Sequence, residues 1–225
     1  MSEPSTDYEF TFLRHGESEG NLLNILQGQS DYPLTPEGEQ QARSLGHTWA
    51  AQGVRFDRAI CSTQLRARQT AELVTAFVPT PLEFDPLWME RSFGQFEGLT
   101  VDQVEKENPG IDFLHPYHVM GATGESHLDL YRRACQAVQK LLTLQPGRYL
   151  VVSHGSMLNA TLYAIMGLAP QGRYNSPRFR FANTGFCVFT YHPPRLQWRM
   201  TALDNQVRLP LPPAEAAVAA EMMDC

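Results

Sequence analysis

Two histidines stand out in the chain because their neighbours match. Each lies in a short polar run that ends in glycine: Arg14-His15-Gly16 near the N-terminus, and Ser153-His154-Gly155 about 140 residues later. A glycine has no Cβ, so a ligand can approach its backbone closely. An imidazole can act as a nucleophile, and a guanidinium binds phosphate oxygens through paired N–H groups. The two runs therefore indicate chemistry on an anionic group, provided that the fold brings them together.

A third segment, residues 62–71, adds positive charge. It follows an expected short strand and opens an expected helix, so Arg66 lies near a helix N-terminus. Together with Arg14 and the two histidines, Arg66 would form a cationic hollow in an otherwise acidic protein. Such a hollow suits a phosphoryl group. Arg68 is expected to lie on the solvated face of the same helix.

A fourth segment, residues 87–98, places carboxylates beside aromatic side chains. Glu90 lies close in sequence to Trp88 and Phe93, and partial burial there would favour its protonated form. A protonated carboxyl group can donate a proton to a departing oxygen. Glu97 is the alternative donor, but it is expected to serve a structural role as a cap or pairing group.

The elements that must position these side chains follow from the hydrophobic pattern. Alternating or continuous apolar residues predict strands at 8–12, 58–61 and 149–153, and apolar spacing of three and four predicts helices within 36–49, 65–77, 131–142 and 158–166. Strands that alternate with helices imply a mainly parallel sheet covered by helices on both faces. In such sheets, sites form at the carboxyl ends of the strands, which is where His15 and His154 fall.

The last third of the chain changes to a period of two. Residues 186–190 and 196–202 alternate like the strands of a hairpin, which would add an antiparallel edge. The predicted fold class is thus α/β: three α/β/α layers around a mainly parallel, mixed sheet. We find no repeat or linker, so residues 1–208 are predicted to form one catalytic domain. Residues 209–225, rich in Pro and Ala, are predicted to form a flexible tail.

Composition narrows the classes of protein. The 225 residues are 43% hydrophobic, which excludes a wholly disordered chain, and 18 basic against 24 acidic residues give a net charge of −6. An acidic chain is a poor general binder of nucleic acid. No run approaches the roughly 20 apolar residues of a membrane span, and no secretory signal is visible. The four widely spaced cysteines favour reduced thiols and a cytoplasmic location.

The motifs, taken in order, resemble the histidine phosphatase (phosphoglycerate mutase-like) superfamily over roughly residues 8–190. Each motif alone is weak, but together they are specific. They are Leu13-Arg14-His15-Gly16-Glu17-Ser18 with Asn21, Gly28-x-x-Asp31-x-Pro33-Leu34-Thr35, Ser62-x-x-x-Arg66-Ala67-x-Gln69-Thr70-Ala71, Glu90-x-x-Phe93-Gly94-x-Phe96-Glu97-Gly98, Gly124-Glu125-Ser126 and Val152-Ser153-His154-Gly155.

The resemblance implies a role for each site residue. His15 matches the nucleophile that becomes phosphohistidine, and Glu90 matches the acid that protonates the leaving oxygen and later activates water. The groups that match binders of the phosphoryl oxygens are Arg14, Arg66 and His154. The positions that match contacts to the phosphate or the adjoining substrate are Asn21, Gln27 and Gly28, with Gly155 beside them.

The resemblance implies no cofactor and no metal. Arginines and a second histidine can stabilise the transferring phosphoryl group without a metal ion. His115, His118 and His127 could be imagined as metal ligands, but they are interpreted as exposed loop histidines.

The superfamily holds both phosphatases and mutases. Mutases that depend on a bisphosphate cofactor carry a lysine and then paired arginines soon after the glutamate. Here Val101 falls where the lysine would be, and no arginine pair precedes Arg132-Arg133. The intervening segment 108–125 is expected to form a loop over the pocket, offering His115, Tyr117, His118 and Met120 as its walls.

We therefore predict a phosphomonoester hydrolase that acts on a small phosphorylated metabolite. Two alternatives stay open: a cofactor-dependent phosphoglycerate mutase and a non-catalytic module that binds a phosphorylated ligand. The sequence makes no prediction of the oligomeric state.

Overall fold

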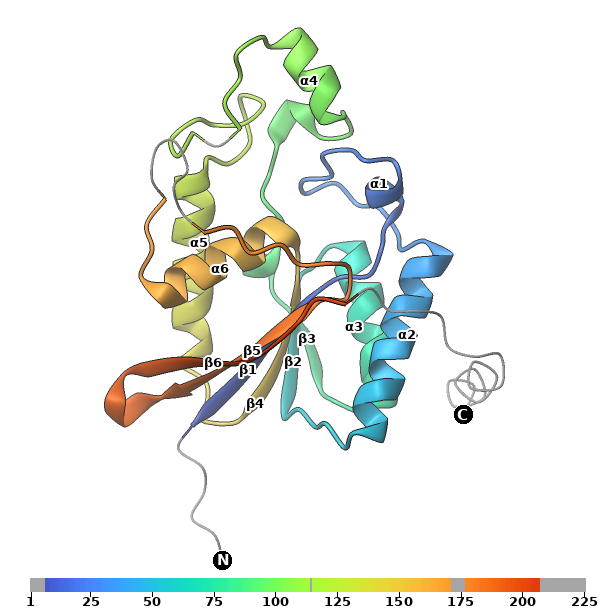
Figure 1. The fold of residues 1–225 in the computed structure, drawn as a ribbon, viewed down its shortest axis with the longest axis vertical. Coiled ribbons are helices and arrows are strands. Elements are labelled where there is room, and N and C mark those ends of the chain that lie inside the picture. The colour runs from blue at the N-terminus through green and yellow to red at the C-terminus, as the bar shows by residue number, and fades with distance from the viewer. Residues whose placement is uncertain (1–6, 114, 171–176, 207–225) are drawn as a thin grey trace, which may run out of the picture.

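The computed structural model describes residues 7–113, 115–170 and 177–206. Six strands form one sheet in the order β3-β2-β4-β1-β5-β6 (Figure 1). The first four strands in this order run parallel, whereas β5 is antiparallel to β1 and β6 to β5. This confirms the mainly parallel sheet with an antiparallel edge. The strands are β1 (Tyr8–Arg14), β2 (Arg58–Cys61), β3 (Leu82–Phe84), β4 (Arg148–Ser153), β5 (Phe186–His192) and β6 (Gln197–Asp204).

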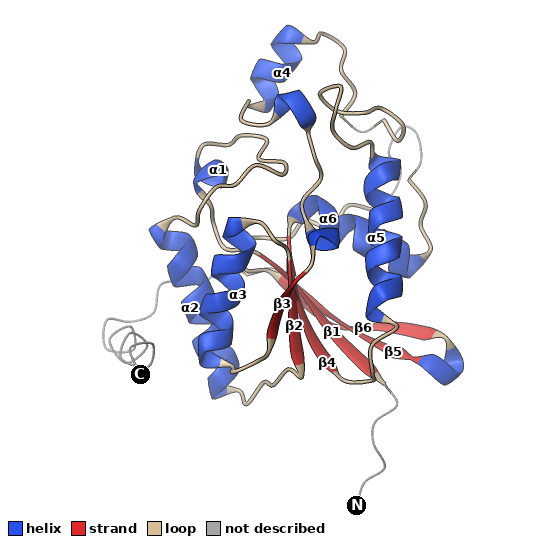
Figure 2. Ribbon diagram, turned by 180° about the vertical axis from the view of Figure 1, so that it is seen from behind, coloured by secondary structure: helices blue, strands red, loops and turns tan. Residues whose placement is uncertain are grey.

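Helices cover both faces of the sheet. One face carries α2 (Pro36–Ala51) and α3 (Leu65–Phe77), and the other carries α5 (His127–Leu141) and α6 (Gly155–Met166) (Figures 1 and 2). The three-layer α/β/α architecture is therefore confirmed. Among the described helices, none combines the length and the apolar character that a membrane crossing needs.

The burial of β4 explains why its sequence reads as one apolar run. Tyr149 and Val151 pack into the core beneath α5 and α6, whereas Leu150 and Val152 pack into the core beneath α2 and α3. A central parallel strand has helices on both sides, so both sets of its side chains are buried.

Cap signals fix the starts of the main helices. The Thr35 hydroxyl accepts from the backbone N–H of Gly38, 3.0 Å away, and Pro36 occupies the first turn of α2, as the sequence predicted. The N-terminus of α5 lies before the apolar stripe that begins at Tyr131, because Ser126 and Asp129 form a reciprocal capping box.

Several short elements were not predicted. They are β3, α1 (Glu19–Leu22), α4 (Val101–Glu107) and three turns of 3₁₀ helix at Pro86–Trp88, Gly94–Phe96 and Pro193–Arg195. Each has too few residues to show a periodic pattern. The capping box of α4, Thr100 with Gln103, is a local signal that could have revealed it. The predicted tail 209–225 lies outside the described residues, and the extent of the domain stays a prediction.

Two glycines allow the N-terminus of α2 to pack against the loop that follows β1. A Cβ on Gly38 would lie 1.9 Å from the carbonyl oxygen of Glu17, and a Cβ on Gly16 would lie 2.5 Å from that of Gly38. No larger residue fits without moving backbone atoms. This close packing fixes the position of the loop that carries His15.

Candidate active site

The two predicted histidines lie side by side. His15 follows β1 and His154 follows β4, and these strands are paired so that Arg14 stands opposite Ser153. The centres of the two imidazole rings are 5.1 Å apart. Ser62 follows β2, the next strand along, and its Oγ lies 2.8 Å from Nε2 of His154. Parallel pairing therefore gathers side chains from three strand ends at one edge of the sheet.

His15 is held as a neutral imidazole with one nitrogen available. Its Nδ1 lies 2.6 Å from the carbonyl oxygen of Gly16, so the Nδ1–H donates there and Nε2 keeps its lone pair. The side chain is only 2% exposed. Burial, and then the charges of Arg66 and Arg14, lower the pKa of His15 well below its usual value. At neutral pH, Nε2 can therefore attack an electrophile.

Three buried nitrogens near His15 have no hydrogen-bond partner among the described residues: Nε of Arg14, Nε of Arg66 and Nδ1 of His154. Leaving a buried donor unpaired costs free energy, so this arrangement is unusual. The other ends of these side chains are fixed. Arg14 donates to the carbonyl of Phe181 (2.7 Å), Arg66 to those of Ser30 (3.0 Å) and Gly28 (2.9 Å), and His154 contacts Ser62. The hollow is thus built to receive an anion.

The charges in the hollow also favour an anion. Burial lowers the pKa of Arg66 to about 10, so Arg66 is still a cation at neutral pH. Burial and Arg66 also lower the pKa of His154 well below its usual value. A neutral His154 whose Nε2 accepts from the Ser62 hydroxyl carries its proton on Nδ1, as a donor.

Glu90 is the carboxylate whose charge acts most strongly on Arg14 and Arg66. It accepts hydrogen bonds from the backbone N–H groups of Arg91 (2.8 Å), Ser156 (3.2 Å) and Met157 (3.1 Å), so it lies at the N-terminus of α6. A Cβ on Gly155 would lie 4.0 Å from Oε2 of Glu90 and 3.9 Å from Nε of Arg14. Gly155 thus lies between the carboxylate and the guanidinium, as a ligand-facing glycine should.

A second carboxylate, Glu97, has a structural position. Its Oε1 accepts from the backbone N–H groups of Gln29 (3.0 Å) and Phe93 (3.1 Å), and its Oε2 accepts from the Ser30 hydroxyl (2.6 Å). These contacts hold two loops together. This agrees with the expectation that Glu97 pairs structurally.

The loop that carries Glu90 is clamped by an ion pair that the sequence analysis did not assign. Nε and Nη2 of Arg133 contact Glu125 at 2.8 and 2.6 Å. Arg133 also donates to the carbonyls of Met89 (2.5 Å) and Glu90 (3.0 Å). Glu125 in turn accepts from the backbone N–H of Ser92, 2.9 Å away. The pair therefore fixes the backbone on both sides of the Glu90 carboxylate.

Three of the predicted substrate contacts take part in hydrogen bonds around the hollow. Oδ1 of Asn21 lies 3.2 Å from Nδ2 of Asn183, and Gln27 accepts from the Ser18 hydroxyl at 2.8 Å. The carbonyl of Gly28 accepts from Arg66 and fixes its guanidinium. Of the four predicted positions, Gly155 alone is among the described residues that line the large cavity beside the hollow.

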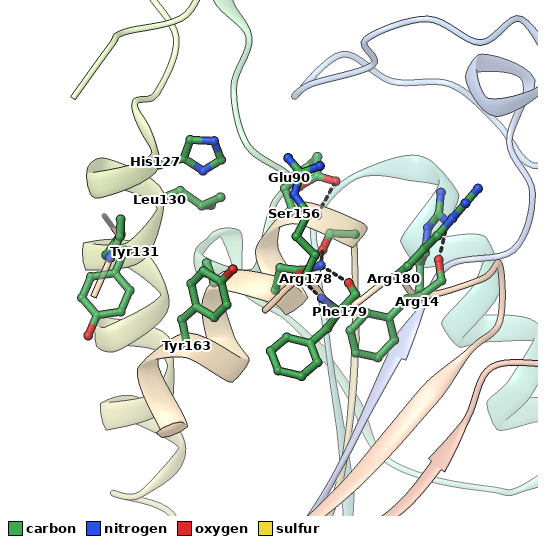
Figure 3. A pocket seen from close by; sticks show the side chains of 15 residues that line it. Arg14, Glu90, His127, Leu130, Tyr131, Ser156, Tyr163, Arg178, Phe179 and Arg180 are labelled. Atoms are coloured by element: carbon green, nitrogen blue, oxygen red, sulfur yellow. Dashed lines mark hydrogen bonds between the residues drawn. The ribbon is translucent and has the colours of Figure 1, made fainter. Parts of the chain in front are cut away.

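This large cavity has a volume of about 560 Å³ and opens beside Arg14 and Glu90 (Figure 3). Its walls come from α5, α6 and the segment before β5, and they combine apolar and cationic side chains. The principal lining residues are Leu130, Tyr131, Tyr163, Arg178, Phe179, Arg180 and Phe181.

The expectation that residues 108–125 form the pocket walls is wrong for the described part of that segment. None of its described residues lines the large cavity. Several of them line a separate pocket at the surface instead. Met120 is fully buried and Tyr117 is 66% exposed. The segment does contact a residue that lines the cavity: the carbonyl oxygen of Phe113 lies 2.9 Å from Nε2 of His127.

His127 also corrects the sequence analysis, which treated it as an exposed loop histidine. It is the first residue of α5, it is half-buried, and it lines the large cavity. His115 and His118 are exposed, as expected. Within the described ranges, no group of three or more His, Cys, Asp or Glu side chains could hold a metal ion.

The residues that the sequence analysis missed have weak local signals. Ser62 stands at a strand end like His15 and His154, so its position could have been read from the same rule. Arg178 and Arg180 alternate with phenylalanines just before β5, a pattern that points two arginines to one side of an extended segment.

A family model described as the histidine phosphatase superfamily (branch 1) matches residues 10–205. The chain belongs to this superfamily. The expected membership is thus confirmed, and the site described above lies within the matched residues.

The chain is similar to proteins that carry different names. A 2,3-bisphosphoglycerate-dependent phosphoglycerate mutase of Bradyrhizobium diazoefficiens is 35% identical over 169 residues, 71% of this chain and 82% of that protein. A phosphoserine phosphatase of Entamoeba histolytica, with 24% identity, superposes with a TM-score of 0.76 over 90% of this chain and 100% of its own. The YhfR protein of Bacillus stearothermophilus, with 26% identity, also gives 0.76 and covers 87% and 96%.

The half-buried position of His127 generates a prediction on stability. Burial, and then the charge of Arg91, lower the pKa of His127 from 6.5 to about 4. Between these pH values the unfolded chain takes up a proton that the folded chain does not, so stability falls as pH falls. His127 contributes at most about 1.4 kcal/mol per pH unit to the slope of the unfolding free energy against pH. In urea unfolding from pH 7 to pH 4, His127→Gln should show a flatter loss of stability than the parent.

The exposed His115 provides the matched control, because His115→Gln removes a histidine from the surface. It should keep the slope of the parent. If His127→Gln also keeps that slope, His127 is not held neutral in the folded protein.

Proposed function

We propose that this protein hydrolyses phosphomonoesters through a phosphohistidine intermediate on His15. The observation that carries the proposal is the set of three buried, unpartnered nitrogens, on Arg14, Arg66 and His154, around a neutral imidazole. A phosphoryl group supplies oxygens for all three, and its phosphorus would lie within reach of Nε2 of His15. Superfamily membership supports enzymatic phosphoryl transfer.

In the first step, Nε2 of His15 attacks phosphorus and the bond to the ester oxygen breaks. Glu90, in its protonated form, gives its proton to that oxygen, so the alcohol leaves uncharged. Negative charge on the three phosphoryl oxygens is stabilised by Arg14, Arg66 and His154, which are already in place.

In the second step, water attacks the phosphohistidine. The carboxylate of Glu90 takes one proton of the water, the P–N bond breaks, and inorganic phosphate leaves while His15 regains its lone pair. Glu90 is then protonated and ready for the next ester. Its position beside Gly155, at the border between the hollow and the open cavity, suits contact with both the leaving group and water.

The choice of hydrolysis over mutase activity is supported by the surroundings of the hollow. Val101, where a mutase lysine would stand, is 40% exposed on α4, and no residue of α4 is among the described residues that line the large cavity. A product that is released readily leaves the phosphohistidine open to water.

Phosphoglycerate mutase activity is the second candidate, and two observations favour it. The curated relative at 35% identity carries that name. In addition, Arg178 and Arg180 return positive charge to the cavity, which the sequence analysis did not anticipate. These arginines come from a different part of the chain than the expected pair.

The covalent step predicts a labelled intermediate. Rapid quenching with a radiolabelled phosphomonoester, under conditions that spare phosphoamidates, should place one acid-labile phosphate on His15. His15→Ala should carry no label and should lose on the order of 10⁴ or more in kcat, as expected for a nucleophile. Label on a serine or cysteine, or an active His15→Ala enzyme, would contradict the mechanism.

The product distribution separates hydrolysis from mutase activity. With 3-phosphoglycerate and 2,3-bisphosphoglycerate as primer, we expect inorganic phosphate to account for most turnover. Phosphate release and 2-phosphoglycerate would be measured in the same sample. Efficient formation of 2-phosphoglycerate with little phosphate release would assign the protein to the mutases instead.

The clamp of Arg133 and Glu125 predicts a kinetic effect of a residue outside the hollow. Replacing Glu90 by glutamine should lower kcat/KM, which reports only the steps up to release of the alcohol, by on the order of 10² for an alkyl phosphate. It should lower kcat/KM for p-nitrophenyl phosphate much less, since that leaving group needs no proton. Arg133→Lys should show the same selective loss, about tenfold, because lysine cannot hold the Glu90 loop at several points.

Arg132→Lys, on the 67% exposed side chain next to it, is the control and should leave both rates unchanged. A loss in Arg133→Lys that is equal for both phosphates would show that Arg133 supports only the fold.

A further inference from the structure

One wall of the large cavity is a strap formed by residues 177–182, just before β5. Its backbone is fixed on both sides. The Tyr163 hydroxyl donates to the carbonyl of Pro177 (2.7 Å), and Oδ1 of Asn159 accepts from the backbone N–H of Phe179 (2.8 Å). Nδ2 of Asn159 donates to the carbonyl of the same phenylalanine. Further along, Nδ2 of Asn205 donates to the carbonyl of Arg180 (2.7 Å).

A residue of the cationic hollow also anchors the strap. Arg14 donates to the carbonyl of Phe181, so the strap is tied to the guanidinium that faces the phosphoryl group. A segment fixed at so many backbone atoms presents its side chains in defined directions. Arg178 and Arg180 alternate with Phe179 and Phe181, and all four line the cavity (Figure 3).

The two arginines extend the positive charge of the hollow across the cavity. Arg180 is close enough to Arg14 to lower the pKa of that guanidinium, and Arg178 acts in the same way on His127 at the α5 side. Positive groups therefore run from the hollow toward α5, along the wall that the strap forms.

The described lining of the cavity holds three arginines and one carboxylate, Glu90. A bound phosphate dianion is matched by Arg14 and by Arg66 beneath it. Arg178 and Arg180 present two further guanidinium groups to the cavity, and a guanidinium binds carboxylate and phosphate oxygens through paired N–H groups. A second anionic group on the substrate would be bound there.

Size and polarity set the rest of the ligand. A volume of about 560 Å³ lies within the range of roughly 300–1,000 Å³ typical of pockets for drug-sized ligands. Leu130, Tyr163 and Phe179 provide apolar surface between the charged groups. Such a wall buries the body of a substrate, while the arginines fix its ends.

We infer that the substrate is a phosphomonoester with an apolar or aromatic body and a second anionic group, a carboxylate or a phosphate-like group, bound by Arg178 and Arg180. This inference rests on the proposed function, because it places the reacting phosphate in the hollow beside His15. It assigns the strap as the element that selects the substrate.

The test uses three phosphate esters with nearly the same phenol leaving group: those of para-hydroxyphenylpropanoic acid, of its primary amide, and of the matching phosphonic acid. The amide has the size of the acid without its charge. The parent should have a kcat/KM about tenfold or more higher for the carboxylate than for the amide, as charge-assisted contacts imply. The phosphonate shows which of the two anionic groups is preferred.

The variants are Arg178→Gln, Arg180→Gln and the double variant, with Arg132→Gln on the exposed face of α5 as the matched control. The ratio of kcat/KM for the carboxylate to kcat/KM for the amide should fall in each single variant and approach one in the double variant. The control should keep the full preference. A parent that does not distinguish acid from amide, or a double variant that keeps the preference, would overturn the inference.

Dissociation constants of the same esters for His15→Ala, measured by calorimetry, separate the inference from the proposed function. If the parent releases no phosphate from any ester, the proposed function is wrong. The inference still stands in that case if the carboxylate binds about tenfold more tightly than the amide and if adding Arg178→Gln and Arg180→Gln removes the difference. Equal binding of acid and amide overturns it.

Discussion

The site depends above all on the parallel pairing of β1 with β4. Because Arg14 stands opposite Ser153, the residues that follow, His15 and His154, leave the sheet side by side with their rings 5.1 Å apart. A slip of one residue in this register would turn one histidine toward the opposite face. The apolar side chains of β4, buried beneath helices on both faces, make such a slip costly. The same burial that stabilises the sheet therefore sets the geometry of the cationic hollow.

A hollow of this kind is an unfavourable place for charges until an anion enters. Arg14 and Arg66 are removed from water, and carbonyl groups of Phe181, Ser30 and Gly28 satisfy only part of their hydrogen-bonding capacity. The histidines respond by staying neutral. This keeps Nε2 of His15 unprotonated and leaves the arginines as the source of positive charge. Preorganised donors of this type stabilise a charged transition state without having to reorient. That stabilisation offsets the free energy that their burial costs.

Sequence reasoning succeeds where the signal is local and fails where it is tertiary. His15, His154 and Arg66 could be placed because each directly follows or opens an element whose apolar pattern is clear. The clamp of Arg133 on the Glu90 loop could not, because it depends on the backbone carbonyls of Leu87, Met89 and Glu90, which lie 43 to 46 residues away in sequence. The choice of residues 108–125 as the pocket wall was wrong for a related reason: the segment follows Glu90 in sequence, whereas the strap at 177–182 approaches it in space. The roles assigned to the individual site residues stay predictions, as do the cytoplasmic location and the small phosphorylated partner.

The structure divides the site into two parts with different constraints. The hollow is made of strand ends and buried side chains, so a substitution there disturbs the sheet as well as the chemistry. The large cavity is made of helix surfaces and the strap, whose side chains can change while the backbone anchors at Asn159, Asn205 and Arg14 stay in place. If the strap selects the substrate as proposed, a change of substrate needs new side chains there and no change in the hollow. In this chain, the geometry of the hollow depends on strand register, whereas the shape and charge of the outer cavity depend on side chains that the sheet does not constrain.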